Sequence, residues 1–262
     1  MVCSDGEKLW RELFKGLSEF KMDRDVISII AFWSFGLFFT VLEVLRPARP
    51  IAYRKYFLND FSAVIMYTIF FQMAVVITDR IPVPQYVPAA VLGLPLSLKI
   101  LAFFIVEDFG LYWVHRFMHT KHIWRVHKWH HSPTYMYWFA GVRATFPHCV
   151  LFNLPFIFAL PILSKAPSLV FPLVMVEHLF RNDWMHMNVT WKSHWLEWVF
   201  VTPRYHHIHH SAAPEHSVAN LGSLLTIWDR LFGTYMDPQA VKTELSFGTG
   251  EKDWSWRIML GL

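Results

Sequence analysis

Long apolar runs alternate with polar segments along this chain. The first run covers 26–45 and is long enough to cross a bilayer as a helix, which takes roughly 20 residues. Further runs cover about 61–78 and about 88–114. Two shorter runs, 149–163 and 168–180, are predicted to form a helical hairpin that is partly buried in protein. The pattern predicts an all-α protein with about four or five membrane helices.

The polar segments between the runs are predicted to lie together on one face of the membrane. If the first three runs all cross and the hairpin returns, segments 46–60, 115–147 and 182–262 share one side. Prolines and charges make 46–60 a predicted loop. Lysines and arginines in these segments indicate the cytoplasmic side, although the five basic residues of 1–25 favour the opposite orientation.

The first 25 residues form a separate unit in this interpretation. Their apolar residues recur at helical spacing opposite charged ones, which predicts an amphipathic helix. That helix either lies on the membrane surface or packs against the rest of the protein. The segment lacks the basic start and apolar run of a cleavable signal peptide. We therefore expect a 1–25 segment followed by a single domain over 26–262.

The composition supports a membrane protein and excludes other classes. The chain is 54% hydrophobic and 18% aromatic but only 17% charged, below the roughly 25% of typical soluble domains. The net charge of +4 is mild, and no basic stripe interleaved with aromatics indicates nucleic-acid binding. Two cysteines cannot form a disulfide framework. We expect an integral, multi-pass membrane protein with no nucleic-acid partner.

The histidines are concentrated in the polar segments. All fifteen lie between residues 115 and 216, and nine of them form four clusters. His115 and His119 have the i,i+4 spacing by which a helix offers two imidazoles to one ion. HKWHH at 127–131 and HHIHH at 206–210 each place three histidines at i, i+3 and i+4, predicted to be one helical face. So many imidazoles exceed the needs of one tetrahedral ion, which predicts a site for two metal ions.

Several strings around these histidines resemble the fatty acid hydroxylase/sterol desaturase superfamily of membrane di-iron oxygenases. They are HRFMH at 115–119, IWRVHKWHHS at 123–132, HMN at 186–188, TPRYHHIHHS at 202–211 and LTIWDRLFGTY at 225–235. The resemblance covers about residues 100–236. It implies that two iron ions are bound by His115, His119, His127, His130, His131, His186, His206, His209 and His210.

One position departs from the pattern of the family. Many members have a His-Pro-x-Glu stretch shortly after the second motif, whereas this chain has His148 near the place of the Glu. His148 is therefore a possible ligand, a hydrogen-bond partner of a ligand or a plain interface residue. Asp108 and Asn188 are further candidates for ligation or for orienting a ligand. The remaining histidines are predicted to be structural or on the surface: His122, His178, His194, His207 and His216.

Other residues are expected to support the centre. A ligating histidine donates its second ring nitrogen to an acceptor, and the candidate acceptors are Asp108, Glu177, Asp183 and Asn188. Asn220 and Trp228-Asp229-Arg230 resemble family positions that order the C-terminal part around the metals. The aromatic patch of Tyr135, Tyr137, Trp138 and Phe139 either anchors the chain at the membrane boundary or lines a substrate entry.

The resemblance implies an O₂-dependent hydroxylation or desaturation of a lipid, sterol or other apolar substrate that enters from the bilayer. The sequence contains no haem domain, no Gly-rich dinucleotide motif and no cysteine set for an iron–sulfur cluster. Electrons are therefore expected from a separate donor, cytochrome b5-like or a ferredoxin with its reductase.

Two other functions remain open at this point. The first is a membrane zinc hydrolase of a lipid ester or amide, which needs fewer ligands and an open position for water. Arg116 stands where zinc peptidases have a Glu, which counts against peptidase chemistry. The second is a metal-binding membrane protein without catalysis. Iron content and O₂-dependent turnover separate the three.

Overall fold

The structure is a computed structural model that describes residues 21–82, 87–164, 166–167, 170–189, 191–252 and 254–262. These residues form helices and connecting loops without a strand, so the predicted all-α class is confirmed for the described part. Residues 1–20, which hold most of the predicted amphipathic segment, lie outside the described residues.

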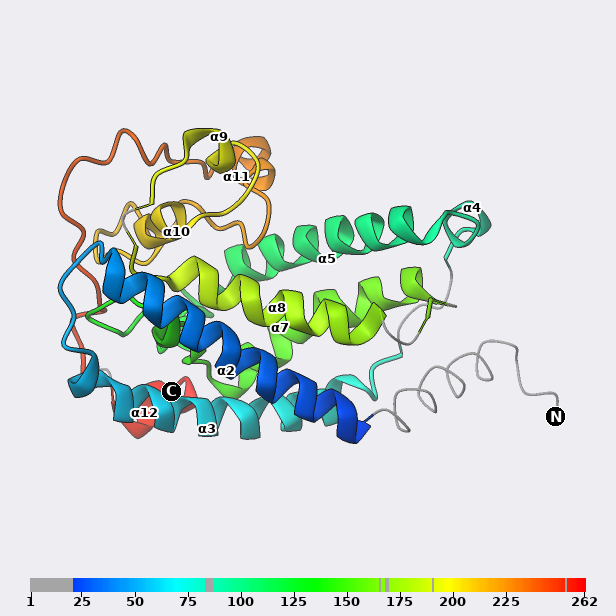
Figure 1. Cartoon of the computed structure of the whole chain (residues 1–262), viewed down its shortest axis with the longest axis horizontal. Helices are drawn as coiled ribbons and strands as arrows, with labels where there is room; N and C mark the ends of the chain where they lie inside the picture. The colour runs from blue at the N-terminus through cyan, green and yellow to red at the C-terminus, as the bar shows by residue number, and fades with distance from the viewer. Residues whose placement is uncertain (1–20, 83–86, 165, 168–169, 190, 253) are drawn as a thin grey trace.

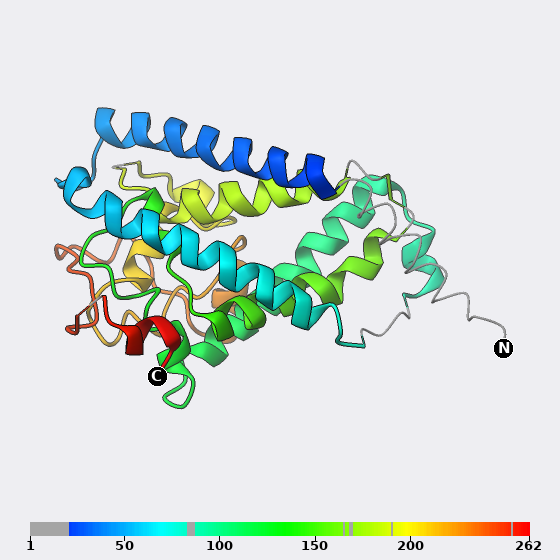
Figure 2. The ribbon, with the colours of Figure 1, turned by 90° about the horizontal axis from the view of Figure 1, so that it is seen from below.

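Five long helices make up the stem of the molecule: α2 (Lys21–Leu45), α3 (Tyr53–Thr78), α5 (Leu96–Met118), α7 (Phe146–Ala159) and α8 (Val170–His186). Successive long helices run in opposite directions, so that the histidine-bearing ends of α5, α7 and α8 meet at the end of the stem where α2 ends and α3 begins (Figure 1). The expected placement of the three polar segments at a common end is thus seen in the fold. Figure 2 shows the same arrangement from below.

Short helices build a cap on that end of the stem. They are α6 (Trp124–His127), η1 (Trp138–Val142), α9 (His194–Glu197), α10 (Pro203–His209), α11 (Ile227–Phe232) and α12 (Trp256–Leu260). At the opposite end lies α4 (Ala89–Leu92), and η2 (Leu160–Leu163) continues α7. Loops make up much of the cap, so its shape depends on side-chain contacts more than on helix packing.

The two helices of the predicted hairpin pack mainly against other helices and not against each other. Helix α7 packs chiefly against α3 and α5, whereas α8 packs chiefly against α2 and η1. Gly110 permits the close approach of α5 and α7, because a Cβ at that position would lie 2.8 Å from the Cβ of Pro155. Apolar side chains from α5, η2 and α8 share one buried cluster that includes Phe103, Leu163 and Val174.

The outer surface of the stem is strongly apolar. Large hydrophobic side chains are exposed along α2, α3 and α5, among them Leu37, Leu58 and Leu101. Within the described residues, Tyr53–Thr78 and Phe146–Leu163 are long and apolar enough to cross a membrane, and Ile29–Leu45 is a shorter apolar helix. An apolar surface of this extent is unusual for a soluble monomer.

Two element boundaries differ from the sequence prediction. Helix α3 begins at Tyr53, so the second half of the predicted loop 46–60 is helical. Its buried Asp60 forms an ion pair with Arg143, which explains a charged residue at a buried position of this helix. The predicted run 88–114 is interrupted after Leu92, and Pro95 precedes the first residue of α5. Helix α5 then continues past the apolar run to Met118, as its histidine spacing predicted.

The aromatic patch after the second histidine cluster is part of the core. Tyr135, Tyr137, Trp138 and Phe139 are at most 6% exposed. The backbone N–H of Trp138 donates to the Glu43 carboxylate, and its indole Nε1–H donates to Thr40 of α2. The expectation that this patch anchors the chain at the membrane boundary is wrong, because the side chains join α2 and α3 to the cap instead.

Candidate metal centre

Nine histidines converge on two adjacent points in the cap. One group contains His115, His119, His127, His131 and His209, and the other contains His130, His186, His206 and His210. Within each group, one ring nitrogen per residue lies within 4.8 Å of all the others. These are the nine histidines that the resemblance singled out, and the structure brings all of them together.

The grouping divides both HxxHH motifs. His127 and His131 belong to one group, whereas His130 belongs to the other. Helix α6 ends at His127 and the chain turns there, so this motif does not form the continuous helical face that its spacing predicted. In α10, His209 is likewise separated from His206 and His210. Each motif therefore contributes to both points, and the two groups are built from the same segments.

Backbone carbonyls fix the orientation of four of these rings. The Nδ1 atom of His115 lies 2.7 Å from the carbonyl oxygen of Leu221. His209 makes the same contact with Ala219 at 2.9 Å. His130 and His186 do so with Arg143 at 3.2 Å and Asn182 at 2.7 Å, respectively. Because a carbonyl can only accept, each Nδ1 carries the proton and each Nε2 of a neutral ring has a free lone pair.

This protonation pattern places lone pairs opposite one another. The Nε2 atoms of His130 and His186 are 3.3 Å apart, and neither carries a proton when both rings are neutral. In the first group, the Nε2 atom of His115 carries no proton and lies 3.0 Å from the Nε2 atom of His127, whose Nδ1 contacts His148 and not a carbonyl. Two facing lone pairs repel unless a cation lies between or beside them. The donor set therefore fits a bound metal ion in each group.

Unpartnered ring nitrogens support the same conclusion. Buried nitrogens of His119, His131, His206, His209 and His210 have no hydrogen-bond partner among the residues that the structure describes. Orphaned buried polar atoms are costly unless an ion or water satisfies them. Burial and the neighbouring imidazoles hold the pKa of His131 and His209 well below the ordinary value. These rings are consequently neutral near pH 7, which is the form that binds a metal ion.

The same burial predicts that the metal-free protein loses stability in acid. Burial lowers the pKa of both His115 and His186 from 6.5 to about 4. Between these values the unfolded chain binds more protons than the folded chain, so the free energy of unfolding falls as pH decreases from about 6.5 to about 4. Thermal unfolding of metal-free protein in detergent across this range measures the effect. A midpoint independent of pH would contradict it, and His122→Ala, at an exposed position, serves as the control.

A turn of the cap presents two of the four carbonyls. Asp229 of α11 accepts hydrogen bonds from the backbone N–H groups of Leu221 and Gly222, at 2.7 and 2.8 Å. It also accepts from the hydroxyl of Tyr205 in α10, at 2.9 Å. Asn220 in this turn has a φ of 55°, in the left-handed region that Asn tolerates. Asn220 and Asp229 thus order the segment that orients His115 and His209.

The additional candidate residues lie near the groups but belong to neither. The Nδ1 of His148 lies 3.2 Å from that of His127, so His148 contacts a member of the first group. Asp108 accepts from the backbone N–H groups of Leu224 and Leu225 and from the Trp228 indole. The side-chain amide of Asn188 accepts a hydrogen bond from the backbone N–H of Arg49 and donates one to the carbonyl oxygen of Arg49. Asp108 and Asn188 therefore hold the loops of the cap.

The predicted carboxylate acceptors bond to other groups. Glu177 forms an ion pair with Arg181. Asp183 accepts a hydrogen bond from the side-chain amide of Asn182, which is not one of the nine histidines. The observed acceptors are backbone carbonyls, which sequence reasoning missed. Any residue type supplies a carbonyl, so no residue identity could have revealed them. The resemblance of Asn220 and Trp228-Asp229-Arg230 to family positions that order the C-terminal part gave a partial signal.

The other histidines have the structural or surface positions that were expected. His122 and His194 are exposed. His207 is buried and contacts Arg49 and the carbonyl oxygen of His186. His216 contacts Ser211. His178 pairs with the buried Glu107 of α5, which satisfies an ionisable residue within the stem.

Gly141 of η1 lies directly against the second group. A Cβ at this position would come within 2.3 Å of Nδ1 of His186. We expect Gly141→Ala to displace the His186 ring and to weaken metal binding by about 10–100-fold, the usual cost of disturbing a ligand's support. Metal retained against a chelator measures the change. Gly93→Ala is the matched control, because its nearest neighbour would be 3.4 Å away; equal retention in both variants would contradict the prediction.

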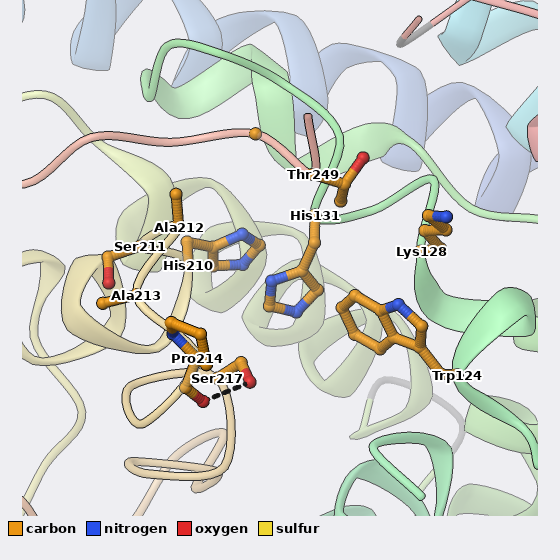
Figure 3. Close-up of a pocket in the computed structure, with 11 residues that line it drawn as sticks. Trp124, Lys128, His131, His210, Ser211, Ala212, Ala213, Pro214, Ser217 and Thr249 are labelled. Carbon is orange, nitrogen blue, oxygen red and sulfur yellow. Dashed lines mark hydrogen bonds between the residues drawn. The ribbon is translucent and has the colours of Figure 1, made fainter. Parts of the chain in front are cut away.

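A cavity of about 260 Å³ connects the centre with the cap surface. His131 and His210 lie at its inner side, one from each group, with ring centroids 4.2 Å apart (Figure 3). Trp124 and Lys128 form one wall. Ser217 and Thr249 add polar lining. The cavity gives small polar molecules a route to the junction between the two groups.

Comparisons with known proteins agree with the geometry. The family model for the fatty acid hydroxylase domain matches residues 100–234. The chain is 32% identical to alkylglycerol monooxygenase from Xenopus tropicalis over 134 residues, covering 51% of this chain and 29% of the relative. It is 32% identical to ornithine lipid hydroxylase OlsE from Rhizobium tropici over 146 residues, covering 55% and 44%. Methylsterol monooxygenase 1-3 from Arabidopsis thaliana is 28% identical over 153 residues, covering 54% and 50%.

The matched region contains all nine histidines of the two groups. The chain spans half the length of these relatives or less. No solved structure matches the chain significantly.

Proposed function

The chain belongs to the fatty acid hydroxylase family, and from this premise we propose that it is a membrane-bound di-iron oxygenase that hydroxylates or desaturates an apolar substrate. The observation that carries the proposal is the convergence of nine histidines into two adjacent groups, with the unprotonated Nε2 atoms of His130 and His186 facing each other at 3.3 Å in the second group. Nine neutral imidazoles in two adjacent sets match two metal ions better than one. In the proposal, each group binds one iron ion.

The bound irons would supply the oxidising chemistry that cleaves an unactivated C–H bond with O₂. The protein's own residues hold the rings in place. The carbonyls of Leu221 and Ala219 orient His115 and His209 in the first group. The carbonyls of Arg143 and Asn182 orient His130 and His186 in the second group. Burial of the rings excludes bulk water and keeps them unprotonated.

The proposed substrate is a lipid, sterol or other apolar molecule that enters from the bilayer. The apolar outer surface of the stem favours a lipid environment. The relatives named above act, by their names, on an alkylglycerol, an ornithine lipid and a methylsterol. In hydroxylation, one atom of O₂ enters the C–H bond and the other leaves as water, which consumes two electrons and two protons. A separate protein, cytochrome b5-like or a ferredoxin with reductase, would supply the electrons.

The proposal places the stem across the membrane and the cap on its cytoplasmic face. Five long helices of alternating direction would make the chain multi-pass, within a single domain over 26–262. Basic residues near the cap ends of the stem, such as Arg46, Arg49 and Arg54, favour the cytoplasmic side. The cavity at His131 and His210 would then admit O₂ and water from that side.

Purified protein tests the proposal directly. We expect about two irons per chain and O₂ consumption that depends on a reductant and on added lipid. Lipid profiling of cells with and without the protein should show a product heavier by one oxygen or lighter by two hydrogens. Zinc at the site with hydrolysis products would indicate a lipid hydrolase instead. Bound metal without O₂ consumption would indicate a non-catalytic metal protein.

A further inference from the structure

One side of the cap exposes an unusual set of large apolar residues. Trp195 of α9 and Trp198, which directly follows that helix, are 75% and 66% exposed. In α11, Ile227 and Leu231 are 46% and 63% exposed and lie one helical turn apart. We call these four residues the α9–α11 face. Cap residues that merely cover the metal centre would be expected to turn such side chains inward.

The two helices that carry this face are tied together. The guanidinium of Arg230 stacks over the Trp198 ring at 4.2 Å and donates to the carbonyl oxygen of Glu197. The hydroxyl of Thr226 donates to the carbonyl oxygen of Trp198 at 3.0 Å. The face is therefore held by contacts among its own elements, and its exposure is a property of the folded cap.

The face continues directly into the apolar surface of the stem. Trp228 of α11 contacts Phe109 of α5 with ring centroids 5.1 Å apart, and Phe232 contacts Trp113 at 4.9 Å. Phe109 and Trp113 are themselves 40% and 41% exposed. In Figure 1, α9 and α11 project beyond α5 at the cap end of the stem. The cap is thus wider than the stem on this side.

The chemistry of the face matches a membrane–water boundary. Indole rings have an apolar body and a polar N–H, and they concentrate at the headgroup level of bilayers. Exposed Lys192 lies between Trp191 and Trp195 in sequence, and Trp191 is 52% exposed. A cation beside exposed indoles suits contact with phosphate headgroups.

We propose that the α9–α11 face inserts into the headgroup–acyl boundary of the same membrane that the stem crosses. The occupant of this surface is lipid, and the cap is a monotopic element attached to a multi-pass stem. This rests on the proposed membrane topology. Contact on this side sets the height of the two histidine groups above the bilayer, and hence how far a substrate chain must rise to reach them.

Site-directed spin labelling of the full chain in phospholipid vesicles tests the proposal. In a Cys3→Ser background, the remaining Cys149 is buried. Labels are placed singly through Trp195→Cys, Trp198→Cys and Leu231→Cys. Relative accessibility to O₂ and to a water-soluble nickel chelate gives the depth of each label. We expect all three at the boundary, roughly 5–10 Å into the headgroup–acyl region.

Two reference labels separate the possible failures. Ile65→Cys, on the exposed surface of α3, reports the bilayer interior. Val218→Cys, 52% exposed on a cap loop beside the cavity residue Ser217, reports water. The proposal is overturned if the labels on the α9–α11 face are as accessible to the nickel chelate as the label at position 218. If the label at position 65 still lies deep in the bilayer in that case, the proposed membrane topology is unaffected. Labels shielded from both reagents would also overturn the proposal, because they would indicate a protein partner or a second copy.

Discussion

Replacing His130 by Ala is expected to remove the metal ion of one group, and replacing the adjacent His131 is expected to remove the ion of the other. The two residues are neighbours in sequence but belong to different groups. Each variant should retain about one of the two metal ions per chain when it is purified in the presence of iron. Activity should fall below roughly one hundredth of the parent in both, because residues that act as a unit do not substitute for one another.

Metal analysis by mass spectrometry, combined with single-turnover O₂ consumption, checks this prediction. His209→Ala should reproduce His131→Ala, and His186→Ala should reproduce His130→Ala, since these pairs share a group. His207→Ala is the matched control, because this buried histidine of α10 directly follows His206 in sequence and belongs to neither group. Full metal content in all four variants would refute the division into two groups, and full activity would refute the di-iron proposal.

The sequence predicted which histidines form the candidate metal centre, but it did not predict how they are distributed between the two groups. Helical spacing pointed to eight of the nine histidines, and the family resemblance added His186, which stands alone in the sequence. The spacing of HKWHH also predicted one helical face. That inference failed because α6 ends at His127, and a turn that follows sends His130 and His131 to different points. Helical spacing of residues predicts a shared face only within a continuous helix, and it does not predict that a helix ends after four residues.

The fold was predictable in its class and less so in its boundaries. Apolar runs located the stem helices because burial in lipid or protein requires runs of that length. Hydropathy could not locate the start of α3 at Tyr53, since the polar residues before position 61 resemble a loop. In the sequence, Asp60 resembles an interruption of the apolar helix. It is nevertheless buried in the helix because it pairs with Arg143, which lies more than eighty positions later in the chain. Such distant partners are set by the tertiary structure alone.

The ion pair between Asp60 and Arg143 links the stem to the second histidine group. Both side chains are fully buried, and the Nε of Arg143 donates to Asp60 at 2.9 Å. The hydroxyls of Tyr135 and Tyr137 donate to the other carboxylate oxygen, at 2.8 and 2.7 Å. The carbonyl oxygen of Arg143 in turn accepts from His130. A change in α3 is therefore transmitted to a proposed metal ligand.

Asp60→Ala is expected to destabilise the protein by about 3–5 kcal/mol, because it leaves the Arg143 guanidinium buried without its counter-ion. It should also weaken metal binding at the second group more than at the first. Unfolding in detergent measures the stability, and metal retention after chelation measures the coupling. Replacing both partners, in Asp60→Leu/Arg143→Met, should cost less than Asp60→Ala alone, because no unpaired charge remains.

The control for this prediction is Ser62→Ala on the same helix. Ser62 is exposed, and its hydroxyl donates only to the carbonyl of Leu58 one turn earlier. Its replacement should change stability by less than about 0.5 kcal/mol, as for most surface substitutions. A loss in Asp60→Ala no greater than in Ser62→Ala would mean that water replaces the carboxylate beside Arg143. In that case the buried pair could not be what fixes the carbonyl that orients His130.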